Sequence, residues 1–553
     1  MATITAPSPK PAGTLFDRKP RSPKYRRTRI VIFSVILLVG VIYVLTKLVS
    51  DLSTTHASTI FPYMLLGLAL LIALGFEFVN GFHDTANAVA SVIYTHSLDP
   101  HVAVIWSGIW NFLGVLTSSG AVAFAIVSLL PIELILKVSH GSGFSMVFAL
   151  LVAAILWNLL TWARGLPASS SHTMIGSILG VGIANQLMHP GSLTSGIDWS
   201  ELVKIGKALF FSPLVGFTGA FLLLWVMKKY ITDPELYRAP VDDQPPPFWI
   251  RCLLICTCSG VSFAHGSNDG QKGMGLVMLI LVGTVPTAYA LNHTVGPDQL
   301  FDFVAVSQQV SDTLGHYIRP SATLPGPAGM NSSTTPTASA AELEHFISTR
   351  QYSSDTTLAL RGMVDKIRAE AEFSGSLGNV PPDDQTNVRN QMYLVSETLG
   401  LLEKFGPAGG LHLASADAPI LKNYRDKLDR STKYIPTWVK VAVALALGFG
   451  TMFGWRRIVV TVGEKIGGKH LTYAQGACSD IVSMLTILSA TQFGLPVSTT
   501  HVVSSGVAGT MTANGSGLQF RTIRNIALAW LLTLPTAALL SGSLFWLFNR
   551  ITR

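Results

Sequence analysis

Two short stretches place acidic side chains inside otherwise apolar sequence. NGFHDTANA (80–88) contains Asp84, and HGSNDGQKG (265–273) contains Asp269. An ionisable group at membrane depth is energetically costly, and it usually marks an ion pathway or a proton relay. Asp84 and Asp269 are therefore candidates for carrying a proton or binding a cation. Because carboxylates are also oxygen ligands, the same two residues are candidate ligands of a metal ion.

A second pair of motifs is rich in hydroxyl groups and contains a proline turn. LPASSSH (166–172) and LPVSTTH (495–501) each read as the start of a new helix. A helix start presents free N–H groups and a partial positive charge, so it attracts anions, and the hydroxyls add uncharged donors. Together with polar residues of the acidic motifs, the candidate anion-binding residues are Ser169, Ser170, Ser171, Ser498, Thr499, Thr500, Asn87, Asn268 and Lys272.

Carboxylates beside an anion repel it unless a cation binds too. That requirement couples anion uptake to cation uptake. Histidine titrates near neutral pH, and Glu77 precedes Asp84 by seven residues on the same helix face. The candidate cation-coupling residues are Asp84, Asp269, His83, Glu77, His172, His265 and His501. The alternative for each is a helix cap or a hydrogen-bonded buried side chain. Asp480 has no counterpart in the other motif and is interpreted as structural.

The composition is that of a membrane protein. Of 553 residues, 49% are hydrophobic and 13% charged, and the mean hydropathy is +0.44. Recurrent apolar runs predict an all-α membrane protein with 10–12 transmembrane helices. Much of the net charge of +8 lies in a basic tail, residues 1–28, which the positive-inside rule places in the cytoplasm. Residues 29–50 are expected to form an anchor helix, and a cleaved signal peptide is the alternative.

Residues 289–435 read as a soluble insert. This stretch has twelve Lys/Arg and sixteen Asp/Glu, so it has no basic patch for nucleic acid. We expect the first part of this stretch, which includes 319–342, to be a flexible linker, and the rest to form short helices such as 356–372 and 388–405. The four cysteines have no metal-binding or redox spacing and are expected to be apolar packing residues.

The paired motifs indicate an internal duplication. Asp84 and His172 are 88 residues apart, and Asp269 and His501 are 232 apart; the difference of 144 matches the length of the insert. We therefore expect one transport repeat and the start of a second over 51–288, with the remainder over 436–553. An odd number of spans in the first repeat predicts inverted repeats with interrupted helices, the architecture of many secondary transporters. We expect the acidic motifs to interrupt their helices: Asn80–Gly81 ends one segment and Asp84 caps the next, and Gly266–Asp269 offers the same arrangement.

These motifs, quoted with their surroundings, resemble the inorganic phosphate transporter (PiT) family and its bacterial low-affinity phosphate permeases. The resemblance rests on GFHDTANAVASVIYT, GLPASSSHTMIGSILG, SFAHGSNDGQKGMGLVMLILVG and GLPVSTTHVVSSGVAGT. It implies that phosphate-binding loops lie at Ser169–Ser171 and Ser498–Thr500, and that the family's G-x-N-D pattern falls on Asn268 and Asp269. In the first half His83 replaces the asparagine, which favours protons over sodium.

The resemblance implies import of inorganic phosphate across the inner membrane by proton symport, with phosphate free or as a neutral complex with a divalent metal. The expected protein is multi-pass, has no enzymatic activity and no bound cofactor, and contacts membrane lipids but not nucleic acid; a homodimer is compatible with this interpretation. Sodium coupling, another oxyanion, an anion channel and an intramembrane hydrolase using Ser171 are the alternatives. The hydrolase alternative is disfavoured because the sequence has no G-x-S-x-G nucleophile elbow.

Overall fold

The described part of the chain is helical and contains no β-strand. This computed structural model describes residues 26–53, 61–136, 141–190, 196–240, 244–293, 297–318, 336–376, 379–405 and 413–551. Within those ranges, one isolated bridge joins Gly467 to Leu518. The all-α class predicted from the sequence is confirmed. The predicted basic tail lies almost entirely outside the described residues.

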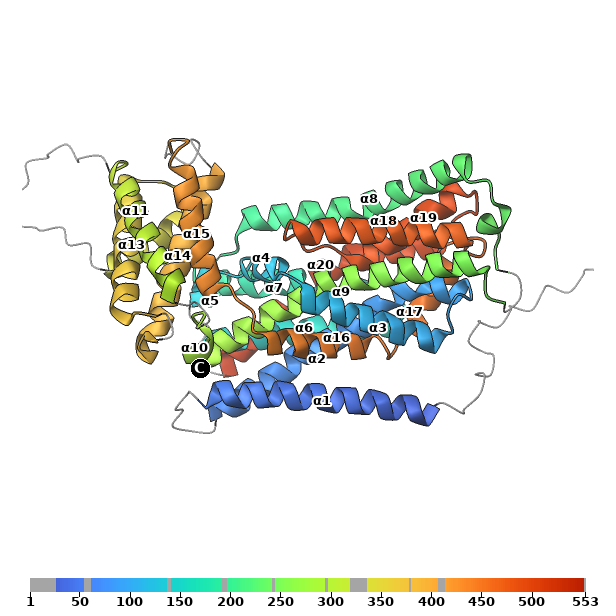
Figure 1. Cartoon of the computed structure of the whole chain (residues 1–553), viewed down its shortest axis with the longest axis horizontal. Helices are drawn as coiled ribbons and strands as arrows, with labels where there is room; N and C mark the ends of the chain where they lie inside the picture. The colour runs from blue at the N-terminus through green and yellow to red at the C-terminus, as the bar shows by residue number, and fades with distance from the viewer. Residues whose placement is uncertain are drawn as a thin grey trace, which may run out of the picture.

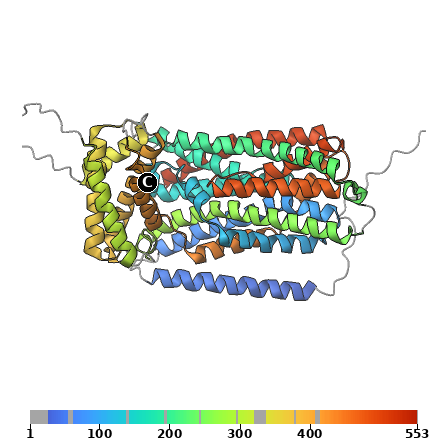
Figure 2. The ribbon, with the colours of Figure 1, turned by 45° about the horizontal axis from the view of Figure 1, so that its top comes forward.

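The helices form a long bundle with a separate helical unit at one end (Figures 1 and 2). The helices before the insert are α1 (Arg26–Leu52), α2 (Phe61–Tyr94), α3 (Pro100–Thr117), α4 (Ala121–Val127), α5 (Ile132–Leu136), α6 (Gly141–Ala163), α7 (Ser170–Met188), α8 (Trp199–Tyr230), the 3₁₀ turn η1 (Pro234–Tyr237), α9 (Phe248–Thr284) and α10 (Pro286–Tyr289). Those after it are α16 (Thr437–Gly450), α17 (Arg456–Val460), the π-helical turn η4 (Thr461–Lys465), α18 (Tyr473–Gln492), α19 (Thr499–Ala513) and α20 (Phe520–Ile551).

The helical unit at the end of the bundle is built from the predicted insert. It contains α11 (Pro297–Gly315), α12 (Pro336–Thr349), α13 (Ser354–Ser374), α14 (Pro382–Phe405) and α15 (Ala418–Thr432). These helices bury a hydrophobic core of their own, which includes Leu360, Met392 and Tyr424. Two details differ from the expectation. The first part of the insert, predicted as linker, contains the helix α11, and α12 begins at Pro336, still within the stretch predicted as linker; residues 319–335 lie outside the described residues.

Six of the described helices are long and apolar enough to cross a membrane, or seven if α3 and α4, which bend by 76°, form one span. The sequence predicts ten to twelve. The difference comes from helices such as α7, α16, α18 and α19, which complete the bundle but are shorter or more polar. Their serine, threonine and glycine residues are tolerated because neighbouring helices surround them.

The expected anchor helix lies along the outside of the bundle as α1. Its candidate span, Ser34–Leu52, is entirely outside the packed interior. Its far end is tied to the bundle through Asp51, whose Oδ2 accepts hydrogen bonds from the Tyr289 hydroxyl at 2.7 Å and from Trp438 Nε1 at 3.1 Å. An apolar surface of this length is stable only against lipid or a partner. α1 therefore fits the predicted peripheral anchor.

Two predicted helix breaks are absent. The acidic motifs were expected to interrupt their helices at Asn80–Gly81 and at Gly266–Asp269, yet α2 and α9 run through both motifs without a break. The glycines serve close packing instead. A Cβ on Gly81 would lie 2.2 Å from the Leu447 carbonyl oxygen, and one on Gly266 would lie 2.1 Å from that of Asn111. Close backbone approach is a common role of small residues in membrane helices.

The same glycine contacts show how the two halves pack. Gly81 and Gly266 are equivalent in the duplicated motif. Gly81 of α2 packs on α16, and Gly266 of α9 packs on α3, so each half supplies the partner helix of the other. The two acidic motifs are thereby held against each other in the middle of the bundle.

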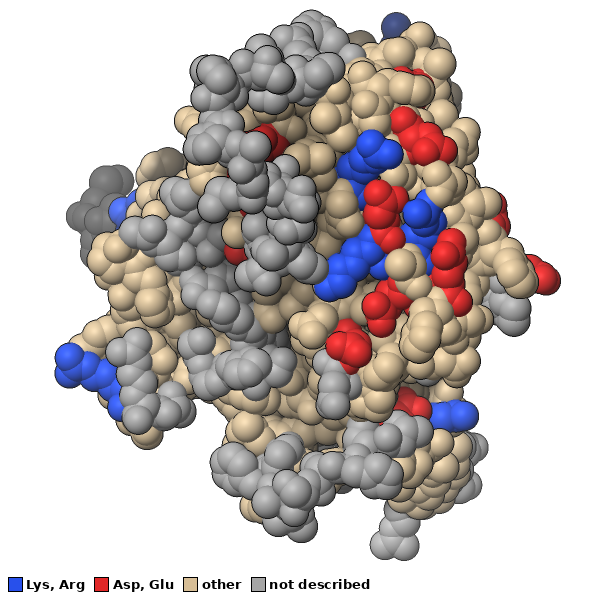
Figure 3. Space-filling model, turned by 90° about the vertical axis from the view of Figure 1, so that its left-hand side faces the viewer, with Lys and Arg blue, Asp and Glu red and all other residues tan. Residues whose placement is uncertain are grey.

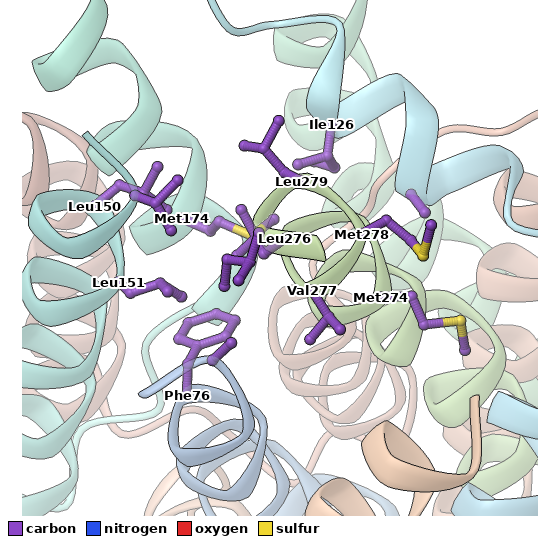
Figure 4. Close-up of a cluster of buried hydrophobic side chains, with 14 of the residues drawn as sticks. Phe76, Ile126, Leu150, Leu151, Met174, Met274, Leu276, Val277, Met278 and Leu279 are labelled. Carbon is purple, nitrogen blue, oxygen red and sulfur yellow. The ribbon is translucent and has the colours of Figure 1, made fainter. Parts of the chain in front are cut away.

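α9 runs through the centre of the largest hydrophobic core. Beyond Lys272, its residues 273–281 are all buried. Figure 4 shows Leu276, Val277 and Leu279 of α9 among side chains of α2, α4, α6 and α7, including Phe76 and Met174. This packing fixes the position of the Asp269 motif and places a buried, largely apolar layer between it and the insert.

Candidate functional site

The two hydroxyl-rich motifs form turns before α7 and α19, as predicted. Each turn contains a glycine with a left-handed backbone: Gly165 has φ +64° and Gly494 has φ +66°. Side chains are strained in this conformation, so glycine allows the chain to leave one helix sharply and begin another.

The first serine of each motif caps the new helix. Ser169 Oγ accepts a hydrogen bond from His172 N, and Ser498 Oγ accepts one from His501 N, both at 3.1 Å. Caps of this kind satisfy one of the free backbone donors at a helix start. The hydroxyls that follow each cap are therefore the ones that face the acidic motifs.

The two carboxylates meet at one buried hydroxyl. Ser170 Oγ donates to Asp84 Oδ2 at 2.5 Å and also lies 3.4 Å from Asp269 Oδ2. All three residues are at most 3% exposed. Like charges so close in a buried setting repel strongly, so positive charge must accompany them.

Asp84 is held by hydroxyl donors from two other helices, α7 and α19, and by its neighbour His83 on α2. Thr500 Oγ1 donates to Asp84 Oδ1 at 2.6 Å, and His83 Nδ1 lies 3.1 Å from the same oxygen. The other ring nitrogen of His83 lies 3.2 Å from Thr161 Oγ1 of α6. With Ser170 of α7 and Thr500 of α19, both halves of the chain converge on this carboxylate.

Asp269 has a charged partner instead. Lys272 Nζ lies 2.7 Å from Asp269 Oδ1 and also donates to Ser171 Oγ and, at 3.3 Å, to the carbonyl oxygen of Val497. Lys272 is completely buried. Two carboxylates and one ammonium group give a formal charge of −1 when the histidines are neutral.

The two predicted asparagines lie in different settings. Asn87 Nδ2 donates to Thr500 Oγ1 at 3.0 Å, next to Asp84. Asn268 Nδ2 donates to Thr491 Oγ1 at 2.9 Å and to the carbonyl oxygen of Leu495 at 3.2 Å. Asn268 therefore holds the turn before α19, whereas Asn87 belongs to the group around Asp84.

The histidines divide into two groups. His172 and His501 face each other with ring centroids 4.5 Å apart, and His501 stacks on Trp530 at 3.8 Å. His83 and His265 lie beside the acids. His265 Nδ1 is 2.6 Å from Asn111 Oδ1, and its Nε2 is 3.6 Å from Asp269 Oδ2.

Glu77 lies on α2 beside the Asp269 motif. It is completely buried, and Asn80 Nδ2 donates to its Oε2 at 3.4 Å. A Cβ on Gly273, the residue after Lys272, would lie 2.3 Å from Glu77 Cγ. Glu77 therefore packs directly on the α9 backbone, close to the site, but among the described residues it makes no hydrogen bond to either aspartate.

Three side chains lie close enough to hold one metal ion. Ligand atoms of Asp84, His265 and Asp269 all lie within 4.8 Å of one another. Carboxylates suit magnesium, calcium and manganese, and an imidazole adds affinity for transition metals. This set contains both predicted metal ligands and adds His265.

One hydroxyl at the site has no partner. Thr499 Oγ1 is buried and, among the described residues, makes no hydrogen bond. Its counterpart in the other repeat is Ser170, which bonds Asp84. A buried donor without an acceptor is unfavourable, so Thr499 is available to a ligand oxygen.

Several contacts could not be anticipated from the motifs. The Val497 carbonyl, Thr161 and Trp530 contact site residues, but a backbone atom, a threonine and a tryptophan in apolar helices give no sequence signal. Asp480, interpreted as structural, accepts hydrogen bonds from Ser91 at 2.6 Å and from Thr257 at 3.1 Å. It joins α18 to α2 and α9.

Comparison with known proteins gives consistent relatives. The phosphate transporter family matches residues 80–541. The low-affinity inorganic phosphate transporters PitB and PitA of Escherichia coli are 39% and 40% identical, respectively; each alignment covers 88% of this chain, and 97% and 96% of the relative. A probable low-affinity inorganic phosphate transporter of Bacillus subtilis is 26% identical over 88% of this chain and 97% of its own. A solved structure titled "The sodium-dependent phosphate transporter" matches with 20% identity and a TM-score of 0.45, covering 88% of this chain and 100% of that one.

Proposed function

Because this chain belongs to the phosphate transporter family, we propose that it imports inorganic phosphate into the cell by proton symport, using the buried group around Asp84 and Asp269. The observation that carries the proposal is the convergence of Ser170 and Thr500, one from each repeat, on the Asp84 carboxylate. Phosphate oxygens take over these hydroxyl donors, together with Lys272 and the unpartnered Thr499.

Charge balance supports coupling to a cation. Asp84, Asp269 and Lys272 together have a formal charge of −1. Dihydrogen phosphate with one proton leaves that charge unchanged, whereas phosphate alone makes it more negative in a buried place where repulsion is strong. A neutral metal–phosphate complex satisfies the same balance, with Asp84, His265 and Asp269 as the ligands closest to its metal.

The surroundings of Asp84 support the proton as the coupling ion. His83 lies between Asp84 and Thr161, so its imidazole can receive a proton from one side and pass it to the carboxylate on the other. A protonated Asp84 becomes a donor to a phosphate oxygen. The counterpart of His83 is Asn268, which cannot titrate and holds the α19 turn.

The helix directions support inverted repeats. α7 and α19 begin at the same site, because Ser170 and Thr500 both bond Asp84. From there α7 extends toward the insert and α19 toward the opposite end (Figure 1). Two related helices that diverge from a common point are what an inverted duplication produces, and rocking of one half against the other would expose the site alternately.

The distribution of basic residues supports a cytoplasmic N-terminus. α1 ends near α10 at the insert end of the bundle, so it starts at the opposite end. Connections at that opposite end carry Lys228, Lys229, Arg238, Arg251, Arg456, Arg457, Lys465, Lys469, Arg521 and Arg524. By the positive-inside rule, this end lies on the cytoplasmic side of the inner membrane, and the insert lies on the opposite side.

The test is phosphate uptake into vesicles containing the purified chain, with proton, sodium and magnesium gradients imposed one at a time. We expect an inward proton gradient to drive accumulation and Asp84→Asn to abolish it. Asp384→Asn, at an exposed acid of the insert, is the matched control and should retain full uptake. Accumulation driven by sodium alone would overturn proton coupling, and gradient-independent uptake by Asp84→Asn would indicate a channel.

A further inference from the structure

A buried arginine of the insert leaves one edge of its guanidinium unused. Arg389 of α14 is only 9% exposed. Its Nη1 donates to the carbonyl oxygen of Ile135 at 3.3 Å and to Asn390 Oδ1 at 3.1 Å, which ties α14 to the end of α5. Among the described residues, Nε and Nη2 have no acceptor, yet neither is sealed inside the protein. These two donors share one edge of the planar guanidinium, and such an edge matches two oxygens of an oxyanion.

Arg389 lines a small cavity between the insert and the bundle. The volume of this cavity is about 50 Å³, several times what one water molecule needs. One side of α9 forms an apolar wall that includes Met278 and Val282, and Tyr393 lies under the guanidinium, with its ring centroid 5.6 Å from Arg389 Cζ. Since Arg389 is otherwise buried, its accessible edge belongs to the wall of this cavity.

A ligand can reach the small cavity through a larger one. Ser128, Tyr393 and Glu397 line both the small cavity and a neighbouring cavity of about 770 Å³. The larger cavity has charges of both signs, including the ion pair of Arg350 and Asp198 at 2.6 Å. Figure 3 shows the same mixture of acidic and basic side chains on the surface of the insert end. The approach therefore admits ligands of either sign, and selection takes place at Arg389.

The charges around the small cavity favour an anion. Its charged wall residues are Arg389, Lys433 and Glu397, two cations and one acid. Glu397 already pairs with Lys433 at 3.2 Å, and Lys433 also contacts Asp429 at 3.0 Å. Among the described residues no acid pairs with Arg389, and burial lowers the pKa of its guanidinium. A buried cation without a counter-ion is costly, and a bound anion removes that cost.

The same helix connects this cavity with the central site. α9 runs without a break from Asp269 to Met278 and Val282. At about 1.5 Å per residue, the backbone of Met278 lies about 14 Å beyond that of Asp269. An anion beside Arg389 is therefore held on the insert side of the buried layer that covers the central site.

We propose that this cavity is a second binding site for inorganic phosphate, filled from the insert side of the protein. Nε and Nη2 of Arg389 donate to two phosphate oxygens, and Tyr393 adds a hydroxyl in the same wall. A tetrahedral oxyanion fits this paired edge, whereas chloride offers it a single atom. The choice of phosphate among oxyanions rests on the proposed function, because the transported anion then passes this end of the bundle.

The test is hydrogen exchange of the full chain purified in detergent, in inorganic phosphate or in chloride at equal ionic strength. We expect phosphate to slow exchange in α14 around Arg389 about tenfold when its concentration is about ten times the dissociation constant. Arg389→Gln should abolish this protection. Arg368→Gln, at an insert arginine that lies 3.5 Å from Asp365 and does not line the cavity, is the matched control and should keep it.

Two further variants separate this site from its alternatives. Asp84→Asn, which disables the central group, should keep the protection of α14, so failure of the transport proposal leaves this readout intact. Arg389→Lys keeps the positive charge but loses the paired edge, so it should weaken the protection even if Arg389→Gln does not fold. Circular dichroism checks that each variant is folded.

Three results would overturn the proposal. Equal protection of α14 by phosphate in wild type and in a folded Arg389 variant would show that the guanidinium does not bind the anion. Equal protection by chloride would show that the cavity does not recognise an oxyanion. A phospholipid retained in native mass spectrometry by wild type and lost in Arg389→Gln would assign the guanidinium to a lipid headgroup in place of free phosphate.

Discussion

Asn87 and Lys272 are counterparts in the duplicated motif, and each donates to the equivalent hydroxyl of a hydroxyl-rich turn. Asn87 Nδ2 donates to Thr500 Oγ1 at 3.0 Å, and Lys272 Nζ donates to Ser171 Oγ. The contact is thus repeated, but a neutral amide in one half is replaced by a charged ammonium in the other. This difference makes the central site asymmetric in charge while its framework is duplicated.

Lys272→Asn should make the two halves chemically alike and impair transport. Asp269 would lose its charged partner, and breaking a buried pair in this way typically destabilises a protein by about 3–5 kcal/mol. We expect the KM for phosphate to rise at least tenfold and the melting temperature to fall. Lys422→Asn, at an exposed lysine of the insert, is the control for both measurements. An unchanged KM would show that Lys272 is structural only.

Thr499 and Thr500 should respond differently to alanine. Thr500 bonds Asp84 in this structure, so Thr500→Ala should lower both stability, by about 1–3 kcal/mol, and uptake. Thr499 Oγ1 has no partner among the described residues, so Thr499→Ala should leave the melting temperature unchanged and raise only the KM for phosphate. Wild-type uptake kinetics in Thr499→Ala would remove this hydroxyl from the binding site.

Alanine at the packing glycines should destabilise the bundle. A Cβ at position 81 or 266 would come within 2.2 Å of a carbonyl oxygen on α16 or α3. Overpacking of this kind typically costs about 1–3 kcal/mol. Gly75→Ala, on α2 with no atom within 4 Å of its added Cβ, is the matched control. In thermal unfolding in detergent, Gly81→Ala and Gly266→Ala should have lower melting temperatures than wild type, and Gly75→Ala should not.

Acidification should weaken the contact between the insert and the bundle. Burial alone raises the pKa of Asp198, but the Ser200 hydroxyl and the charge of Arg350 outweigh burial and hold the pKa below its usual value. The ionised form therefore stabilises docking above the usual pKa of an aspartate, and this contribution is lost as the pH falls through the lowered pKa. The protection of the α12 amides, measured as their exchange rate relative to an unprotected amide at the same pH, should stay high from neutral pH to about pH 5 and fall below about pH 4.

Asp198→Asn should quicken the same exchange already at neutral pH, because it removes the charge that pairs with Arg350 at 2.6 Å. Asp384→Asn, at an exposed acid of α14, should not. Equal exchange in the two variants would show that the ion pair does not hold the insert.

The two ends of the bundle should face opposite sides of the membrane. In a chain without its four native cysteines, Asp384→Cys in the insert should react with an impermeant thiol reagent added to intact cells. Lys469→Cys, exposed at the opposite end, should react only after the membrane is opened. The reverse pattern would invert the proposed topology and place the insert in the cytoplasm.

The candidate site residues and the internal duplication could be predicted from the sequence alone. Burying acids and hydroxyl groups among apolar residues costs free energy unless these polar groups pair with one another. Asp84, Asp269 and the two serine and threonine runs could therefore be predicted to form one site. The caps Ser169 and Ser498 could also be predicted, because capping depends on a residue and its next three neighbours. The separate helical insert was visible from its composition.

Which polar groups pair with one another depends on how distant segments pack in the folded chain. Whether Gly81 and Gly266 break a helix or admit a neighbouring one depends on α16 and α3, which lie far away in the sequence, and here the helices continue. The assignment of Lys272 to Asp269, of Thr500 to Asp84 and of Asn268 to the α19 turn likewise depends on contacts between distant segments. Caps and turns depend on neighbouring residues in the sequence. The contacts between side chains of distant segments depend on how the two halves pack, and no single segment encodes that packing.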